Sequence, residues 1–494
     1  MAGTFTIGEK KVRPGVYYRR INGGGVSTAG ATNGVLACIF QSNWGALNKE
    51  VDLDVTMQNE LSDYYGDYTE ILREGFIGGA LTIRAVRVGG DDGEVSKIIL
   101  KGTKTVEVDD DLDDSTDTTV TPSTTTETVE FDAVEISAAY VGDRKFSASV
   151  RTNLITDQRE LLIYSGVEIF SRVTFESGDN EAENLVSAMS SNKNFNARLL
   201  ENGKLNDIVQ AELTGGKNPT VTVSSYDKGT NVLERFKWNC IVADSDSPAV
   251  AEVLSSFVSQ SYETGHLGFF CVGGKSSQDL DARIQIAAAY NDEKGVYILN
   301  GWKGIDGTIF EGWLAAARLG GMIAAVPCEN SLTHNVINNA LELIEPLTNG
   351  EIIKAEQKGC LVLSLNDSDQ VWIDSAITTL VTADATLDAG WKKIRRTKTR
   401  FELMDRVNTT HDSLIGNINN DADGRATVIA AANAVINEMI AEKKLLLGSY
   451  CYEDTAHPAE GDSAWFTLAI LDIDSLEHIY LTYEFRFGQS FDEE

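Results

Sequence analysis

Basic residues are scarce in this chain of 494 residues. Lys and Arg number 42 against 74 Asp and Glu, which gives a net charge of −32. This charge argues against a nucleic-acid binder, which would need a basic face to meet phosphate groups, and against a protein that docks on an anionic membrane surface. Long apolar runs are also missing. The longest, residues 322–328 and 427–436, are far shorter than the roughly 20 residues of a membrane-spanning helix.

Cysteine and proline are few as well. The 6 cysteines are widely separated and form no CxxC pair, which predicts buried thiols in a protein made in a reducing compartment. The first residues, MAGTFTIGEKK, contain no apolar signal segment, so we expect no export through the general secretory route. Hydrophobic residues make up 42%, enough for a sizeable core, and the length corresponds to about three domains.

Two parts of the chain show a mixed α/β pattern. Residues 34–40 form a continuous apolar run, which is typical of a strand buried on both faces, and residues 81–88 alternate like a half-buried strand. Between residues 220 and 380, strand-like and helix-like segments follow one another. Strands are expected at 240–243, 267–272 and 295–299, and helices at 249–262, 280–290 and 310–323. Such alternation predicts a parallel sheet covered on both faces.

Residues 95–215 have an all-β pattern. Short strand-like runs occupy 97–108, 129–136, 144–151, 159–164 and 167–175, at the spacing of a sandwich. Residues 107–132 interrupt them with ten acids, many threonines and no Lys or Arg. A segment that repels itself and buries little is expected to be a solvated loop.

Both ends of the chain are β-prone. Residues 4–7 and 16–18 precede a glycine joint at 23–25, and such an arm either frays or adds a strand to another sheet edge. At the other end, residues 475–487 alternate strictly and predict a strand. Between residues 391 and 406 the chain is basic, which indicates either a docking face for an acidic surface or a locally neutralised helix. The amphipathic pattern of 427–447 predicts a helix that Gly448 ends.

Motifs for catalysis or cofactor binding are incomplete. The GKS at 274–276 lacks the glycine that a phosphate-binding loop needs five positions earlier, because Phe269 stands there. Asp421 and Asp423 mimic an EF-hand, but its last ligand position holds Ala430, so a turn capping the next helix is the better interpretation. The five histidines show no metal-ligand spacing. We expect no catalytic residue, no cofactor and no metal.

The sequence resembles the contractile phage tail sheath proteins, those of Gram-positive hosts in particular. The matching stretches are 13–17 (RPGVY), 213–218 (LTGGKN), 361–363 with 371–380 (VWIDSAITTL), 391–396 (WKKIRR) and 470–487. The resemblance implies an α/β multidomain fold: a subtilisin-like parallel-sheet α/β core, an inserted all-β sandwich and a C-terminal α/β domain, with extended β-prone arms. The catalytic signatures of subtilisin are absent, so the resemblance carries no activity.

The resemblance also implies a division of the chain and a set of contact residues. The expected parts are an exchanged N-terminal arm (1–25), an α/β part of the core (26–94), the sandwich (95–215), the α/β core (216–382), a C-terminal sheath domain (383–474) and an exchanged C-terminal strand (475–494). Strand exchange between subunits is expected at Phe5, Ile7, Val12, Val16, Tyr18, Ile479, Leu481, Tyr483, Phe485 and Phe487. A charged sheath or tube interface is expected at Lys392, Lys393, Arg395, Arg396, Lys398 and Arg400. The linkers at 23–25 and 472–474 are expected to swing while the exchanged strands stay paired.

The function implied is that of a structural sheath subunit. Copies would polymerise as a helical stack of rings, expected to be hexameric, around an inner tail tube, and contraction would drive the tube through the host envelope to deliver genome or toxin. Expected partners are further copies, the tube protein, and the baseplate and tail terminator proteins, with no direct nucleic acid and no membrane insertion. We expect the protein to be located in the virion tail, which would be assembled in the cytoplasm of the host bacterium. Two alternatives stay open: a non-contractile lattice or shell protein, and an α/β hydrolase.

Overall fold

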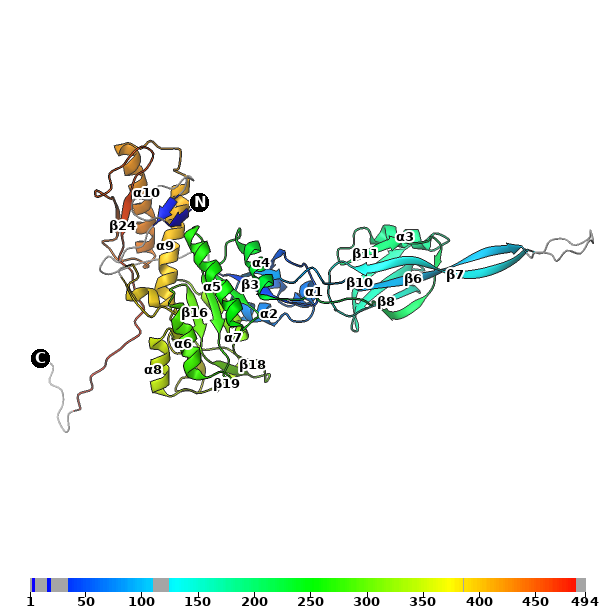
Figure 1. The fold of residues 1–494 in the computed structure, drawn as a ribbon, viewed down its shortest axis with the longest axis horizontal. Coiled ribbons are helices and arrows are strands. Elements are labelled where there is room, and N and C mark those ends of the chain that lie inside the picture. Colours follow the sequence, from blue (N-terminus) through cyan, green and yellow to red (C-terminus); the bar gives the residue numbers. More distant parts are fainter. Residues whose placement is uncertain (1, 5–15, 19–33, 110–123, 385, 486–494) are drawn as a thin grey trace, which may run out of the picture. The chain divides into compact units, whose positions relative to one another are not determined.

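The computed structural model describes the whole chain except residues 1, 5–15, 19–33, 110–123, 385 and 486–494 (Figure 1). The chain divides into two compact units, residues 35–254 and residues 1–34 with 255–494. Helix α5, Pro248–Glu263, runs across the boundary between them in the sequence. Among the helices of the described residues, none combines the length and the apolar character needed to cross a membrane.

The α/β part of unit 35–254 contains four strands in the order β14-β3-β5-β4. Strand β3 (Val35–Phe40) pairs in parallel with β5 (Thr82–Arg87) and β14 (Cys240–Ala243), and β4 (Glu50–Asp54) is antiparallel at the edge. The apolar run at 34–40 is therefore a buried central strand, as predicted. Helices α2 (Glu70–Ile77) and α4 (Val223–Leu233) approach β3 closely because each presents a glycine: a Cβ on Gly229 would lie 2.8 Å from the Ile39 side chain. The short helices η1 (Val55–Met57) and α1 (Leu61–Tyr65) complete this part.

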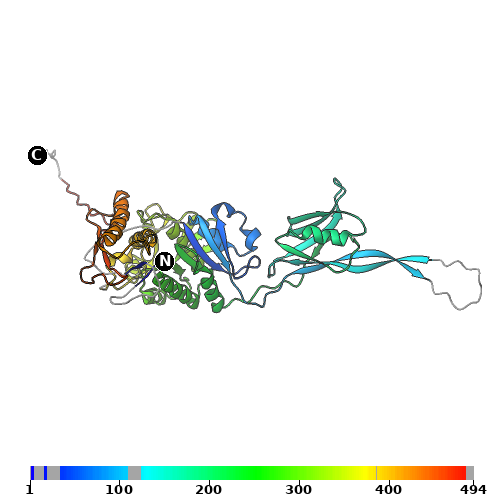
Figure 2. The ribbon, with the colours of Figure 1, turned by 90° about the horizontal axis from the view of Figure 1, so that it is seen from above.

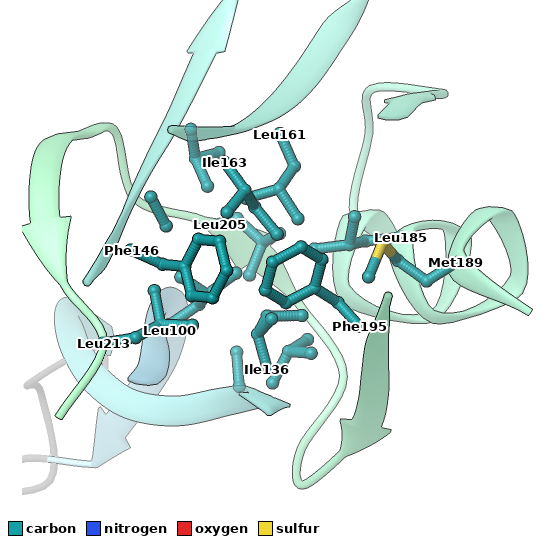
Figure 3. Close-up of a cluster of buried hydrophobic side chains, with 14 of the residues drawn as sticks. Leu100, Ile136, Phe146, Leu161, Ile163, Leu185, Met189, Phe195, Leu205 and Leu213 are labelled. Atoms are coloured by element: carbon teal, nitrogen blue, oxygen red, sulfur yellow. The ribbon is translucent and has the colours of Figure 1, made fainter. Parts of the chain in front are cut away.

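The all-β part of the same unit consists of two four-stranded sheets around one core. One sheet has the order β10-β9-β8-β13 and the other β11-β7-β6-β12. Their bounds are β6 Lys97–Asp109, β7 Thr124–Ala138, β8 Phe146–Thr152, β9 Arg159–Ser165, β10 Glu168–Phe175, β11 Phe195–Leu199, β12 Lys204–Leu205 and β13 Ile208–Glu212, with α3 at Glu181–Met189. Figure 3 shows the rings of Phe146 and Phe195 at the centre of the core, with Leu185 and Met189 entering from α3.

Strands β6 and β7 form a long two-stranded ribbon that projects from this part (Figure 2). The ribbon corrects the prediction of a loop over residues 107–132, because Asp109 pairs with Thr124 and Glu107 with Thr126. Threonine is β-branched and fits a strand, so the flanks of the acidic segment extend the hairpin. The middle of the segment lies outside the described residues.

A tryptophan joins the two parts of this unit. Trp44 precedes β4, yet it is fully buried in the all-β core, with ring centroids of Tyr140 and Phe146 at 5.1 and 4.9 Å. Buried Arg87 at the end of β5 donates hydrogen bonds to the carbonyl oxygens of Ser42, Gly45 and Val141 at 2.8–2.9 Å. The loop after β3 is thereby fixed to the chain that leads into β8.

The other unit begins with a second group of parallel strands. Strands β15 (Phe269–Gly273), β16 (Gly295–Ile298) and β20 (Cys360–Leu361) pair in parallel and alternate with helices α6 (Leu280–Tyr290), α7 (Trp313–Ala325) and α8 (Asn349–Gln357). The predicted α/β alternation of this region is confirmed. A small antiparallel sheet, β18-β17-β19, adds Ile309–Phe310, Gly301–Gly304 and Ala340–Ile344, and β21 (Leu363–Leu365) pairs with β22 (Val371–Ile373).

The C-terminal part of this unit is built on two helices. The turn η2 (Ala389–Lys392) leads into α9 (Ile394–Asp412), which packs against α10 (Ala422–Ala441) and the antiparallel pair β23 (Tyr450–Glu453) and β24 (Phe466–Ala469). The expected helix end at 447 is wrong. The chain turns at Lys443, whose φ is +59°, and Leu445 then enters the core beside Met439. Tertiary burial of Leu445 outweighs the local helical pattern.

Candidate functional site

The N-terminal arm forms a short parallel pair. Strand β1 (Ala2–Thr4) pairs with β2 (Val16–Tyr18), in the register Ala2 to Val16 and Thr4 to Tyr18. Two of the predicted exchange residues, Val16 and Tyr18, therefore lie on a strand. Phe5, Ile7 and Val12, like the glycine joint at 23–25, lie outside the described residues.

The C-terminal arm is extended and exposed. Ile479, Leu481, Tyr483 and Phe485 are 67–91% exposed, and residues 475–485 form no strand with the described part of their own chain. The rings of Tyr483 and Phe485 stack with centroids 6.3 Å apart, so the alternation places them on one side. Phe487 lies outside the described residues. Large apolar side chains that are exposed in a row are typical of interaction surfaces.

The basic stretch at the start of α9 is turned inward. Lys398 donates to the carbonyl oxygens of Ile323 (2.7 Å) and Ala324 (3.1 Å) at the C-terminal end of α7, and also to that of Val326. Lys392 donates to the Glu356 carbonyl oxygen in the last turn of α8, at 2.7 Å. The last carbonyl groups of a helix lack partners within it and carry partial negative charge, so each lysine caps a helix.

The arginines of the stretch are engaged in the same way. Arg400 lies 3.1 Å from Asp388 and 4.4 Å from the centre of the Trp391 ring, and Arg395 donates to the Glu329 carbonyl oxygen at 3.1 Å. Arg395, Lys398 and Arg400 are all buried. The expected docking face is therefore not a free basic surface, and the geometry supports the alternative of a locally neutralised helix.

The linker at 472–474 is held by the remaining cations. Arg396 forms a bidentate ion pair with Asp472, and Lys393 lies 2.9 Å from both Asp474 and Glu477. The expected swinging linker is thus attached in this structure, because its carboxylates meet cations at and just before the start of α9. The sequence signal was present: acids at 472, 474 and 477 match the cations at 393, 395 and 396.

One buried carboxyl group resembles a catalytic acid. Asp244 follows β14, where it accepts hydrogen bonds from the Tyr226 hydroxyl (2.6 Å) and the Gln41 amide (2.8 Å). Burial raises the pKa of Asp244 to about 6, because it outweighs the two hydrogen bonds, which lower the pKa. Both carboxyl oxygens are thus occupied by the chain's own groups.

Histidines and cysteines, the other candidates for chemistry, have structural surroundings. His411 bridges α9 and α10 through the carbonyl oxygens of Val407 (2.7 Å) and Val428 (3.0 Å), and the His334 ring stacks on Trp372. All six cysteines are buried, as predicted, and burial raises the pKa of the Cys360 thiol to about 12. Such thiols are poor nucleophiles.

The two motif mimics are also structural. Asp421 caps α10 by accepting from the Gly424 amide at 2.8 Å, as the capping interpretation predicts. In the GKS segment, the amide and hydroxyl of Ser276 both donate to Glu311, at 2.9 and 2.7 Å, so a carboxylate occupies the place of an anion. Within the described ranges, no group of three or more His, Cys, Asp or Glu residues is arranged to hold a metal ion.

Comparisons with known proteins concern most of the chain. Residues 220–379 match the family model of the phage tail sheath protein central domain. The structure is similar to the sheath tail protein of Desulfitobacterium hafniense, with a TM-score of 0.67, 15% identity, and coverage of 90% of this chain and 97% of that one. It is also similar to the sheath tail protein of Listeria innocua (TM-score 0.65, 16% identity, coverage 90% and 96%). The contracted helical sheath of the anti-feeding prophage follows, with a TM-score of 0.53, 9% identity, and coverage of 96% and 99%. No curated protein sequence matches the chain.

Proposed function

We propose that this chain is a contractile tail sheath protein, because residues 220–379 match the family model of the sheath central domain and the fold is similar to that of sheath tail proteins. As a structural subunit, it forms a helical sheath that surrounds an inner tail tube and drives the tube outward when it contracts. One observation carries the proposal within the molecule: the row of exposed apolar side chains on residues 479–485. Isolated subunits would expose this row to water, whereas polymerised subunits would cover it.

We propose that both arms are exchanged between neighbouring subunits. An extended peptide can add a strand to a sheet edge, with backbone hydrogen bonds holding it and alternate side chains filling pockets. Residues 475–494 have the length and alternation for this, and the short β-pieces of residues 1–25 have the composition. Five or six such bonds, at about 1 kcal/mol net each, together with one apolar face, would hold subunits together while their packing changes.

The finer architecture belongs to the same proposal. The parallel strands and covering helices of 26–94 and 216–382 would form one subtilisin-like core, and residues 95–215 an inserted sandwich. Residues 383–474 would be the C-terminal sheath domain. The two sheets sharing one core support the sandwich, and the α9–α10 core supports the C-terminal domain. No catalysis is proposed, because the buried acid and the motif mimics bind their own chain.

The partners follow from the mechanism. Rings of six copies would stack around a tube protein, with a baseplate at one end and a terminator at the other, in a particle assembled in the bacterial cytoplasm as a virion tail. The similar anti-feeding prophage structure is a helical sheath in its contracted state. The basic stretch, being internally paired, is not proposed as a charged interface of the free subunit.

Electron microscopy of purified protein tests this function. The wild type should form helical tubes, and a variant lacking residues 1–20 should stay folded and soluble without forming them. The double variant Tyr483→Glu/Phe485→Glu should also fail to polymerise, whereas Tyr480→Glu/Thr482→Glu, which adds equal charge to the other face of the strand, should interfere less.

Other outcomes would support the alternatives. Flat sheets or closed shells would identify a non-contractile lattice protein. Monomers that hydrolyse ester or peptide substrates would identify an enzyme. Long tubes from the variant without residues 1–20 would refute the exchange of the N-terminal arm.

A further inference from the structure

We propose that Arg396 and Lys393 are positioning residues that clamp the root of the C-terminal arm, residues 472–477, so that the arm pivots at His478. The inference rests on the proposed function for its purpose, since the arm is what reaches a neighbour. The clamp itself is a property of the single chain.

The inner contact of the clamp is a buried bidentate ion pair. Both nitrogens of the Arg396 fork that face the arm bind the Asp472 carboxylate, whose side chain is 1% exposed. Arg400 lies 3.6 Å from the same carboxylate. Backbone contacts continue the attachment, because the Leu446 amide donates to the Leu471 carbonyl oxygen at 2.8 Å and the Leu471 amide donates to the Ser449 hydroxyl at 2.7 Å. A buried carboxylate stripped of its partner is strongly unfavourable, so this contact resists opening.

The outer contact is a lysine shared by two carboxylates. Lys393 lies 2.9 Å from Asp474 and 2.9 Å from Glu477, and Glu477 also accepts from Ser331 at 3.1 Å. Burial acts to raise the pKa of Glu477, but hydrogen bonds from Ser475 and Lys393 outweigh it and keep that pKa below its usual range. The Lys393 side chain is 27% exposed. Salt therefore reaches the outer contact more easily than the inner one.

Side-chain exposure rises sharply after Glu477. The Glu477 side chain is only 12% exposed, whereas Ile479 is 67% and Tyr480 92% exposed. The pivot of the arm is thus His478, and residues 478–485 extend roughly 26 Å from it. Without the clamp the pivot would retreat toward Leu471. The same strand could then reach many more positions, and the effective concentration at its target would fall.

Spin labels on the full-length protein can test the clamp. The native cysteines are all buried, so a single introduced cysteine takes the label. With the label at Leu476→Cys, 79% exposed, the spectrum should show restricted motion, and with the label at Tyr480→Cys it should show rapid motion. Adding Arg396→Ala or Lys393→Ala should shorten the correlation time at 476 by about threefold or more and leave 480 unchanged.

Control variants separate the clamp from general damage. Arg406→Ala removes another ion pair of α9, with Glu442 at 2.9 Å, and should leave the label at 476 restricted. The exchanged pair Arg396→Asp/Asp472→Arg should restore part of the restriction. If Arg396→Ala lowers the unfolding temperature, Lys393→Ala, which removes only the outer contact, still gives the answer.

The outcomes for clamp and function are distinguishable. Rapid motion at 476 in the wild type, or no change in the Lys393→Ala variant of a folded protein, would overturn the clamp even if tubes form. Failure of the wild type to form tubes would overturn the proposed function, and the spectra would still decide whether the clamp exists. If the clamp and the proposed function are both correct, the protein concentration needed to form tubes should be several-fold higher for the clamp variants than for the wild type.

Discussion

Replacing Asp244 by Asn should make the stability of unit 35–254 less dependent on pH. The pKa of Asp244 is raised by burial from 3.8 to about 6, so the folded state holds a proton that the unfolded state has already lost. Stability is therefore fully present below the unfolded pKa and declines as pH rises through the folded pKa. The full pKa shift contributes about 3 kcal/mol to the free energy of unfolding, and about 1.4 kcal/mol of this contribution is lost between pH 5 and pH 8.

Asn is a suitable probe because it copies the protonated acid. Its amide oxygen can accept from the Gln41 amide, and its NH₂ group can donate to the Tyr226 hydroxyl oxygen. Urea unfolding at fixed ionic strength, followed by tryptophan fluorescence at several pH values, gives the free energy of unfolding of both proteins. Between pH 5 and pH 8, the free energy of unfolding of the Asn variant should rise by about 1.4 kcal/mol relative to that of the wild type. If the difference in free energy of unfolding between the two proteins stays constant with pH, the reasoning is refuted. The variant Tyr226→Phe removes a hydrogen bond that lowers the pKa of Asp244, so its loss of stability should occur at higher pH than in the wild type.

Three further predictions concern packing and buried hydrogen bonds, and thermal or urea unfolding checks each of them. Phe195→Ala should cost about 3–5 kcal/mol, because the ring is fully buried at the centre of the all-β core; a cost under about 1 kcal/mol would mean that this core is loosely packed. Gly142→Ala should cost about 2 kcal/mol or more, since φ is +150° and a Cβ would lie 2.0 Å from the Asn43 carbonyl oxygen, whereas Gly350→Ala in α8 meets open space and should stabilise slightly. Lys398→Met should cost about 3 kcal/mol, because it leaves the Ile323 and Val326 carbonyl oxygens without the lysine donor, whereas the Ala324 carbonyl oxygen keeps the Gly34 amide; a neutral effect would show that water replaces the lysine.

Local pattern predicts the elements whose burial follows from their own sequence. The apolar run of β3 and the helical spacing of α5 are examples, because both faces of a central strand must be apolar and one face of a covering helix must be. The resemblance to contractile sheath proteins, which depends on matching stretches spread along the chain, agrees with the match of residues 220–379 to the sheath central-domain model and with the similarity of the fold to a sheath tail protein.

Features set by distant residues are not predictable in this way. Nothing in the basic stretch reveals that Lys398 meets the end of α7, and the acids at 472, 474 and 477 offer partners without showing that Arg396 meets Asp472, 76 positions away. Helix α3 is absent from the prediction although Ala182, Leu185 and Met189 have helical spacing, because a short helix within an all-β pattern gives a weak signal. Helix α10 ends at Ala441, earlier than the predicted 447, for a related reason: the burial of Leu445 in the core depends on residues outside a local stretch of sequence.

The burial of the basic side chains at the start of α9 affects how copies of the molecule associate. The protein has 42 positive charges, and several of them, including that of Lys398, are buried against backbone carbonyl groups. The surface exposed to solvent is therefore more anionic than it would be if the charges that sum to −32 were all exposed. Two such polyanions repel at long range, over about 8 Å at physiological ionic strength and further in dilute buffer. Nucleation should therefore be slowest in low-salt solution and should be accelerated by magnesium or other multivalent counterions.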